Sequence, residues 1–294
     1  GLLILPPRFE LYRAISRQFH AIFNDYTALV EPLSLDEAYL DVSASTRCQG
    51  SATLIAAEIR GRIRRELGLT VSAGVAPNKF LAKVASDWRK PDGLFTIAPE
   101  QVAQFVTALP VARISGVGRV TAEKLRQLGV ETCGDLQAIP LETLVQRFGR
   151  YGSRLFELAR GEDGRQVQPT RLRKSISVER TFAEDLQHLP EMIDALDALL
   201  AELERRFTRI SAAYIPTKRV IKVKYGDFTQ TTLEEMMVDR AQQWNRPPEF
   251  HRLLETAWAR GSRPVRLLGA GLRLQPRATG MDGQLLLFGM PAAE

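Results

Sequence analysis

A segment with little apolar content divides this chain and limits what it can fold into. Residues 165–174 hold four basic side chains, Pro169 and only two aliphatic side chains. Such a stretch cannot bury itself in a hydrophobic core, so we interpret it as a tether between folded parts. The length of 294 residues agrees with two or more domains.

Residues 1–97 mix two hydrophobic patterns. Apolar residues recur three and four positions apart in some stretches, which predicts amphipathic helices, while others alternate as strands do. Asn78 is placed to cap one of the helices. The order predicts helices covering a small mixed sheet. The helix-like ranges are 11–26, 54–67 and 78–89, and the strand-like ranges are 30–42 and 69–76.

The rest of the chain divides into a helical part, a mixed part and a tail. Residues 98–164 read as helical throughout, with short breaks at Gly or Pro. Residues 175–276 combine both patterns, and 277–294 read as a flexible tail. In the mixed part the strand-like ranges are 175–182, 218–225 and 265–274, and the helix-like ranges are 190–210 and 248–259.

The composition excludes several classes of protein. With 45% hydrophobic and 25% charged residues, the chain is not a disordered one. No apolar run approaches the roughly 18 residues of a membrane helix, so we expect no membrane partner. A secretory signal is also missing. The only cysteines, Cys48 and Cys133, fit a reducing compartment, and we expect the cytoplasm.

The charge balance favours a polyanionic partner. Lys and Arg number 40 against 34 acidic residues, which gives a net charge of +6. Nucleic acid would be attracted to such a chain. On charge alone, a merely basic protein without such a partner is an equal alternative.

Two adjacent acids, Asp36 and Glu37, interrupt an apolar strand-like stretch. On a regular strand they would point to opposite faces, so both can serve one site only if the chain turns there. Paired carboxylates at a hairpin tip are ligands that Mg²⁺ prefers. The alternative is a solvated hairpin tip, and composition alone favours it.

Lys79, Lys83 and Lys90 lie on or just after the helix that Asn78 caps. Lys79 and Lys83 share one face, because they are four residues apart. Three ammonium groups could neutralise a triphosphate. The alternative is a lysine-rich helix face in contact with solvent.

Gly116 and Gly118 form a tight turn directly before a helix start. Exposed backbone N–H groups and the helix dipole suit one phosphate group there. It is not a dinucleotide fingerprint, because no strand precedes it and position 121 is Thr. The alternative is an ordinary turn between two helices.

The tail holds one apolar block. An apolar block in a flexible segment cannot bury itself locally, and a short peptide of this kind suits a groove on a partner. The alternative is that it folds back onto its own domain. The anchor residues are Gln284, Leu285, Leu287 and Phe288.

Taken in order, these motifs resemble those of the Y-family translesion DNA polymerases, and the bacterial DNA polymerase IV branch in particular. The resemblance covers nearly the whole chain, and several ordered motifs are far more specific than any one of them. The matching stretches are 34–41, 73–83 and 90–93 for the palm, 116–125 for the thumb, 174–182 for the little finger and 284–288 for a sliding-clamp motif.

This resemblance implies a fold of α+β class with several domains. It places a partial palm with a mixed sheet and helices at 1–97 and an all-helical thumb with a helix-hairpin-helix at 98–164. After a linker at 165–174 comes an α+β little finger with a four-stranded sheet at 175–276. The tail at 277–294 would bind the clamp, and the protein would act as a monomer.

The resemblance also implies roles for single residues. Asp36 would bind catalytic Mg²⁺, of which the intact family site holds two ions, and Glu37 would be the adjacent catalytic acid. Lys90 would contact the incoming deoxynucleoside triphosphate. Gly116 and Gly118 would hold a phosphate of the primer–template DNA. Further DNA contacts would come from Lys174, Arg180, Lys218, Arg219, Lys222 and Lys224.

One part of the family pattern is not found in this sequence. The family's palm begins with a strand that carries another metal-binding Asp, followed by the fingers domain. We therefore expect an incomplete metal site, in which one ion is weakly held or lost, and an unpaired sheet edge. The second hypothesis is then a module that binds DNA and the clamp without polymerising. A third, a repair nuclease or glycosylase, lacks a suitable acid or base near the hairpin.

Overall fold

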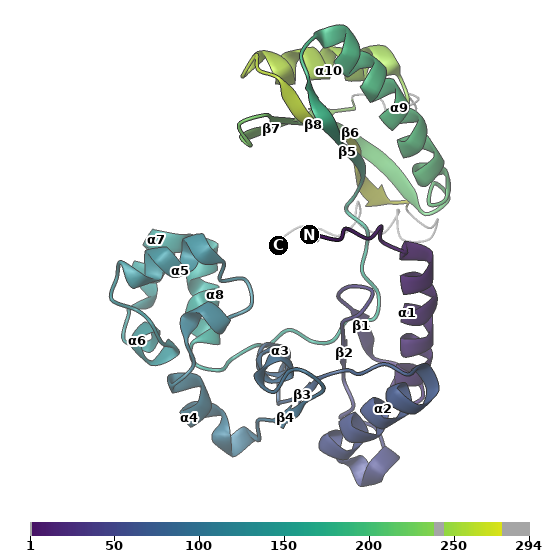
Figure 1. Cartoon of the computed structure of the whole chain (residues 1–294). Helices are drawn as coiled ribbons and strands as arrows, with labels where there is room; N and C mark the ends of the chain where they lie inside the picture. Colours follow the sequence, from purple (N-terminus) through teal and green to yellow (C-terminus); the bar gives the residue numbers. More distant parts are fainter. Residues whose placement is uncertain (1, 238–243, 278–294) are drawn as a thin grey trace, which may run out of the picture. The chain divides into compact units, whose positions relative to one another are not determined.

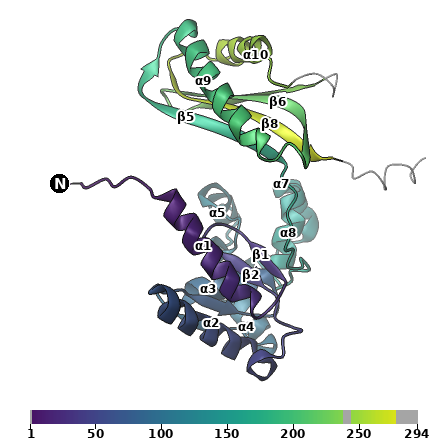
Figure 2. The ribbon, with the colours of Figure 1, turned by 90° about the vertical axis from the view of Figure 1, so that its right-hand side faces the viewer.

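The computed structural model describes residues 2–237 and 244–277, which form two compact units that meet at Thr170 and Arg171 (Figures 1 and 2). The first unit contains α1 (Phe9–Asn24), β1 (Val30–Pro32), β2 (Ala38–Leu40), α2 (Ala52–Leu67), β3 (Ala73–Val75), α3 (Lys79–Trp88), β4 (Leu94–Thr96), α4 (Val102–Thr107), α5 (Arg119–Arg126), α6 (Cys133–Gln137), α7 (Leu141–Phe148) and α8 (Arg150–Leu158). The second contains β5 (Ser175–Leu186), α9 (Leu189–Thr208), β6 (Tyr214–Tyr225), β7 (Gln230–Met236), α10 (Pro247–Ala259) and β8 (Val265–Pro276).

The strands of the first unit form two separate pairs. β1 and β2 are antiparallel, with Glu31 opposite Tyr39, and β3 and β4 are parallel, with Gly74 opposite Phe95. The helices begin and end where local sequence predicts. The Asn78 side chain accepts from the backbone N–H of Leu81 at the start of α3. The combination of strands and helices expected for residues 1–97 is therefore confirmed, but the strands form two separate pairs and not one mixed sheet.

One hydrophobic core joins α3 to the helices that follow it. Phe80 and Leu81 of α3 are buried in the same cluster as Val106, Leu125 and Leu155 from α4, α5 and α8. The predicted boundary between palm and thumb at residue 98 therefore does not separate two hydrophobic cores. A second, smaller cluster lies between α1 and α2, and its buried members are Ile22, Tyr26, Ile55, Ile59 and Ile63.

Asp163, after the end of α8, is the centre of a buried ion cluster. Its side chain has no exposed surface and lies 2.6 Å from Arg154 Nη2 and 2.8 Å from Arg165 Nη2. It also accepts a hydrogen bond from the backbone N–H of Phe80 in the first turn of α3 (3.0 Å). Burial raises the pKa of Asp163, but hydrogen bonds from Arg165 and Arg154 outweigh burial and hold it well below its usual range. The ionised carboxylate therefore ties α3 to the end of α8.

Lys79 and Glu31 extend this attachment into the predicted tether. The Lys79 ammonium, on a residue that is 8% exposed, lies 2.5 Å from Glu31 Oε2 and donates to the carbonyl of Gln166 (3.3 Å). The backbone N–H of Gln168 donates to the same carboxylate (2.8 Å). Burial raises the pKa of Glu31, but hydrogen bonds from Lys79 and Gln168 outweigh it and lower the pKa. The first residues of 165–174 are thus fixed to the first unit rather than free.

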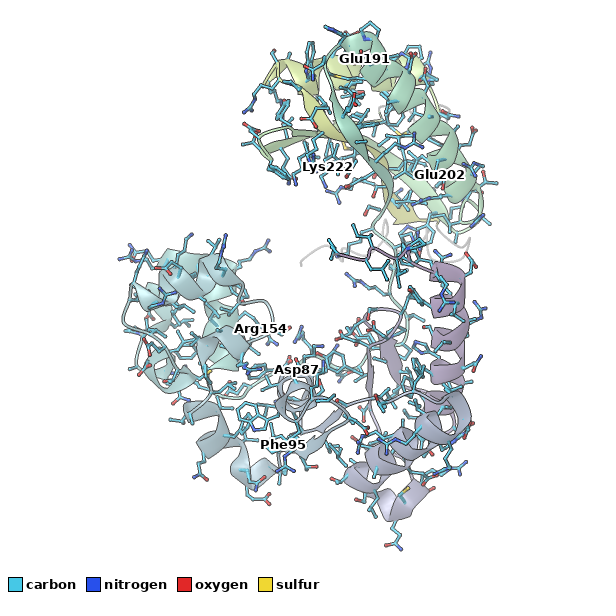
Figure 3. All side chains as sticks on the ribbon, in the orientation of Figure 1. Asp87, Phe95, Arg154, Glu191, Glu202 and Lys222 are labelled. Atoms are coloured by element: carbon cyan, nitrogen blue, oxygen red, sulfur yellow. The ribbon has the colours of Figure 1, made fainter. Side chains whose placement is uncertain are left out.

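The second unit is an antiparallel sheet with strand order β5-β8-β6-β7, which confirms the predicted four-stranded sheet. Helices α9 and α10 cover one face of it (Figure 2). Along β6, Ile221 and Val223 are buried beneath these helices, whereas Lys222 between them lies on the uncovered face. Figure 3 shows Lys222 on the face opposite α9. On α9, Glu202 and Arg206, four residues apart, form an ion pair at 2.8 Å.

The edge strand β7 is an element that the hydrophobic pattern misses. Its sequence places a single aliphatic residue, Leu233, between polar neighbours, so no apolar alternation marks it. Among the described residues, Leu233 is the only member of β7 that packs against the hydrophobic core of the second unit. Polar edge strands carry a weak signal because they bury little. In the described ranges, no helix combines the length and apolar character needed to cross a membrane.

Replacing Asp163 by Asn keeps the size of the side chain but removes the carboxylate that pairs with Arg165, whereas Arg154 keeps its pair with Glu157 at 3.1 Å. Because the charge-assisted hydrogen bonds of Asp163 are lost while the remaining guanidinium groups stay partly exposed, the free energy of unfolding of the first unit should fall by about 2 kcal/mol at neutral pH. Urea denaturation followed by the fluorescence of Trp88, the only tryptophan of that unit, measures the change.

The same variant tests the pKa of Asp163. A lowered folded-state pKa gives stability that is complete above the unfolded pKa and is lost as the pH falls through the folded value. The difference between the two proteins should therefore stay constant above about pH 5 and shrink below about pH 4. Glu162→Gln, at the exposed neighbour, should behave like the unaltered chain. A difference unchanged down to about pH 2 would contradict the assignment.

Candidate functional site

The hairpin between β1 and β2 carries both acids of the predicted site at its tip. The backbone N–H of Leu33 donates to the carbonyl of Glu37 (2.9 Å), which closes the turn. Asp36 is exposed, and its Oδ1 accepts from the hydroxyl of Ser34 (2.7 Å). A regular strand would have pointed the two carboxylates to opposite faces. The chain turns at this point instead, which is the condition for both acids to serve one site.

The lysines of α3 face this hairpin. Lys83 Nζ lies 2.5 Å from Glu37 Oε1, and Lys79, one turn earlier, lies 2.5 Å from Glu31 in β1. The shared face predicted for these lysines therefore exists, but its charges are paired with the hairpin. Because Lys79 is buried in its ion pair, we leave it out of the candidate triphosphate site.

Lys90, directly after α3, lies within electrostatic reach of the two acids. Its ammonium is 2.5 Å from Asp87, which Figure 3 shows on α3. This hydrogen bond is the main cause that raises the pKa of Lys90, and the charges of Glu37 and Asp36 raise it further. The tertiary structure thus exposes Lys90 to the charges of Asp36 and Glu37, although Lys90 lies more than 50 positions after both acids in the sequence.

Asp36 and Glu37 offer carboxylates, which are ligand types that a divalent ion accepts. Within residues 2–237 and 244–277, no group of three or more Asp, Glu, His or Cys side chains is arranged to hold an ion. Mg²⁺ in phosphate-transfer sites is commonly bound by one or two carboxylates, with water and substrate phosphates completing the shell. Asp36 and Glu37 at an exposed tip fit that pattern.

The glycine turn before α5 has the predicted open geometry. Gly116 has a φ of +99°, which favours glycine, and a Cβ there would come within 3.0 Å of Tyr151 Oη. Gly118 is the N-cap of α5, and a Cβ there would meet no atom within 4 Å. The first backbone N–H groups of α5 therefore lie at an open turn, where a phosphate could approach them.

Strand β6 separates the predicted DNA contacts onto two faces. Lys218, Lys222 and Lys224 alternate with buried residues, and so they lie on the uncovered face. Arg219 points the other way. It is 3% exposed, donates to the carbonyl of Trp244 (3.2 Å) and lies over the Phe250 ring. Its burial removes Arg219 from the candidate DNA surface.

Two further predicted contacts do not join the lysine row. Arg180 shares its strand parity with Ile176 and Val178, whose side chains are buried beneath the helices, although Arg180 itself is exposed. Lys174 is exposed directly before β5. We therefore restrict the candidate DNA surface to the row Lys218, Lys222 and Lys224.

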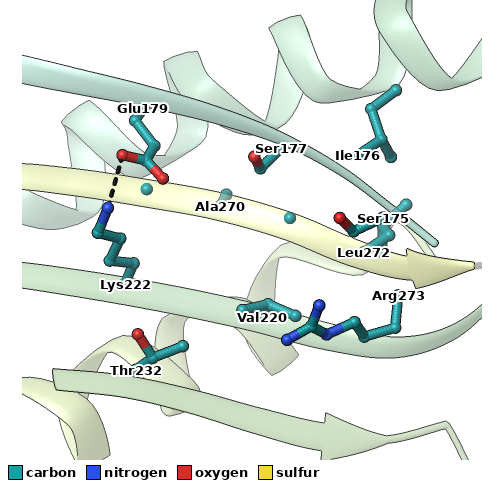
Figure 4. Close-up of a pocket in the computed structure, with 12 residues that line it drawn as sticks. Ser175, Ile176, Ser177, Glu179, Val220, Lys222, Thr232, Ala270, Leu272 and Arg273 are labelled. Atoms are coloured by element: carbon teal, nitrogen blue, oxygen red, sulfur yellow. Dashed lines mark hydrogen bonds and ion pairs between the residues drawn. The ribbon is translucent and has the colours of Figure 1, made fainter. Parts of the chain in front are cut away.

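The uncovered face holds a shallow hollow over β8 (Figure 4). Gly269 and Gly271 form its floor, and a Cβ at either would come within 2.9 Å of strand β5. Acids share this face. Lys222 pairs with Glu179 at 2.9 Å, and Lys218 pairs with Glu234 at 3.2 Å. A polyanion must therefore compete with carboxylates of the protein.

Some residues of this site carry no pattern that sequence reading could use. Glu31 and Asp163 are ordinary acids in loop-like or strand-like surroundings, and their partners lie far away in sequence. The adjacent pair Asp36 and Glu37 was detectable because acids interrupt an apolar stretch. The proposed clamp residues Gln284, Leu285, Leu287 and Phe288 lie outside the described residues.

Family models match three successive parts of the chain. Residues 1–87 match the impB/mucB/samB family, and residues 173–279 match the C-terminal domain of that family. Residues 112–163 match the thumb domain of DNA polymerase iota. Together these matches span the palm, thumb and little finger that the motifs predicted.

Curated relatives match almost the full chain. A protein of Ectopseudomonas mendocina (strain ymp) named DNA polymerase IV is 54% identical over 287 residues, which is 98% of this chain and 80% of the relative. A DNA polymerase IV of Pseudomonas paraeruginosa (strain DSM 24068 / PA7) is 55% identical with the same coverage.

A solved structure has the same fold. A Y-family DNA polymerase chimera of Dbh and Dpo4 superposes with a TM-score of 0.82 at 27% identity, over 92% of this chain and 77% of that one. The relatives exceed half identity over nearly all residues, and the family models follow in the order expected. The chain therefore belongs to the Y family of DNA-directed DNA polymerases, in the DNA polymerase IV branch.

Proposed function

We propose that Asp36 and Glu37 form the acidic part of a site that adds deoxynucleotides to a DNA primer, opposite templates that include damaged bases. The observation that supports this proposal is that the hairpin turns at the two acids and that Lys83 of α3, the helix that precedes Lys90, contacts Glu37 at 2.5 Å. In a chain of this polymerase family, carboxylates beside a lysine suit the transfer of a nucleotidyl group from a triphosphate.

Magnesium fits the acids by ligand type, and we propose two ions in the complete site. Asp36 and Glu37 offer two carboxylates, and the phosphates of the nucleotide with water would complete the shells. When bound, the ions would activate the primer 3′ hydroxyl and stabilise charge on the leaving pyrophosphate. For an ion to bind, the Glu37 carboxylate must exchange its ion pair with Lys83 for a bond to the metal.

The two lysines near the acids have different roles in this proposal. Lys90, held by Asp87, presents a positive charge to the triphosphate and orients it for attack. In the absence of substrate, the ion pair with Lys83 holds the Glu37 carboxylate beside α3. The Asp36 carboxylate is exposed at the hairpin tip, so the 3′ end of the primer and the metal ion that accompanies it can reach it.

We propose that the lysine row on the little-finger sheet and the open turn before α5 hold the primer–template duplex. Lys218, Lys222 and Lys224 lie in one row on the uncovered face of β6, where they can contact backbone phosphates. The N–H groups after Gly118 suit one phosphate. These contacts read charge and not sequence, which suits an enzyme that works at any template position.

We further propose a sliding clamp as partner, bound by Gln284, Leu285, Leu287 and Phe288, with the chain acting as a monomer in the cytoplasm. The support is the apolar block in a polar tail, together with two free cysteines, Cys48 and Cys133.

A second candidate is a module that binds DNA and the clamp without polymerising. The observation that favours it is the small number of ligands, because no third acid, His or Cys among the described residues joins Asp36 and Glu37. With less negative charge at the tip, two divalent ions would be held weakly.

Primer extension with Mg²⁺ and four deoxynucleotides separates the two candidates. We expect the chain to extend the primer, and Asp36→Ala to lower the rate by about 1,000-fold, since an ion of this kind contributes several kcal/mol to the transition state. Asp41→Asn, at a nearby acid that accepts from the backbone N–H of Ser43, should extend like the unaltered chain. DNA bound without extension by any of these proteins would favour the binding module.

Affinity for duplex DNA should depend on the lysine row. Replacing Lys218 and Lys222 by Gln should lower the slope of log affinity against log salt by about two, because each lysine displaces about one counterion. Glu179→Gln should tighten binding, since Lys222 then loses its competing carboxylate. Fluorescence anisotropy over a salt series measures both. Arg205→Gln, which removes one positive charge from α9, should leave the slope unchanged.

Deleting residues 284–288 should abolish binding to a sliding clamp and leave affinity for DNA nearly unchanged. Surface plasmon resonance against an immobilised clamp measures the first, and anisotropy with duplex DNA the second. A scrambled version of the same five residues is the control for tail length. Clamp binding that survives the deletion would refute this assignment.

A further inference from the structure

The turn between β6 and β7 holds an aromatic side chain in solvent. The turn runs from Tyr225 to Gln230, and Phe228 within it is 62% exposed. Its φ is +67°, a left-handed conformation that bulky side chains seldom adopt. Neither burial nor backbone preference accounts for a phenylalanine at this position, so the side chain points to a function.

The turn is built to keep this conformation. The backbone N–H of Phe228 donates to the carbonyl of Tyr225 (3.0 Å), and Tyr225 N–H donates to Thr229 (2.9 Å). Asp227 Oδ1 accepts from both the N–H (3.0 Å) and the hydroxyl (2.7 Å) of Thr229, and Asp227 also pairs with Arg263. The ring is therefore presented by a fixed turn that is hydrogen-bonded on both sides.

Two cations flank the exposed ring. Lys224 Nζ lies 4.8 Å and Arg266 Cζ lies 5.0 Å from the ring centre. They come from different strands, β6 and β8, which converge at this turn. Lys224 is also the last member of the lysine row, so a polyanion that follows the row reaches Phe228. The acids near the turn are Asp227, paired with Arg263, and Asp185, which is 3.9 Å from Arg266.

We propose that Phe228, Lys224 and Arg266 bind one unpaired nucleotide of single-stranded DNA. An aromatic ring between cations matches the two parts of a nucleotide, since the base stacks on the ring and the phosphate meets the charges. The base must be unpaired, because the faces of bases within a duplex are covered by their neighbours. This inference rests on the proposed DNA-binding role of the lysine row and adds to it a site that selects single strands.

The flanking cations also make an apolar protein partner the weaker choice. A ring that docks into a protein core would bury Lys224 and Arg266 beside it, at the cost of removing two charges from water. A nucleotide supplies the phosphate that compensates them. Because every base has an aromatic face, we expect little dependence on base identity.

The affinity test compares Phe228→Leu with Phe228→Trp on two ligands at one salt concentration, a 20-nucleotide oligo(dT) and a blunt duplex of equal length. The leucine variant keeps an apolar side chain but loses the stacking face. We expect it to bind oligo(dT) about 10-fold more weakly and the duplex within about 2-fold of the unaltered chain. Phe228→Trp should bind oligo(dT) at least as tightly as the unaltered chain.

A photocrosslinking experiment on the unaltered chain covers the case that a variant fails to fold. A single 5-iododeoxyuridine in the oligo(dT) should crosslink to a peptide that contains Phe228, identified by mass spectrometry. Crosslinks elsewhere only, equal losses on both ligands, or no loss on oligo(dT) would overturn the inference. If those results occur while Lys218 and Lys222 still govern duplex affinity, the proposed function stands. If duplex DNA does not bind at all, the proposed function fails with it.

Discussion

The buried charges around the first turn of α3 are the constraint on which the rest of the first unit depends. Lys79 holds Glu31 in the hairpin, and Asp163 holds two arginines and the N–H of Phe80. One helix is thereby joined to the acidic hairpin, to the helices of the thumb and to the start of the tether. The carboxylates of Glu31 and Asp163 each accept a hydrogen bond from a backbone N–H as well as pairing with cations, and such partners are the condition for keeping an ion in a low-dielectric interior.

In this arrangement the two lysines of α3 have different roles, although they lie on one face of the helix. Lys79 is sealed in its ion pair, while Lys83, one turn later, reaches the exposed tip and contacts Glu37. The buried pair fixes the distance between helix and hairpin, and that distance sets where Glu37 and Lys90 stand. A catalytic constellation needs such support, because small displacements of charged groups cost much of their electrostatic effect.

The second unit shows how burial sorts charges of equal sign. Arg219 and Lys222 are three positions apart on β6, yet the pleat sends one beneath α10 and the other to the open face. On the open face, Glu179 and Glu234 neutralise part of the lysine row. The positive charge of this row is therefore only partly available to DNA. Binding that competes with internal carboxylates is easily released, which suits a polymerase that must move along its template.

The sequence by itself determined the helices with strong periodicity, the cap at Asn78, the glycine turn at Gly116 and the order of motifs that identifies the family. These features are local, so neighbouring residues contain them. It could not determine that Arg219 is buried, that β7 pairs at the edge or that Glu31 fixes the start of the tether. Those depend on contacts between residues far apart in the chain, such as Glu31 with Gln168. Only tertiary packing brings such residues together and decides which charges remain exposed to solvent.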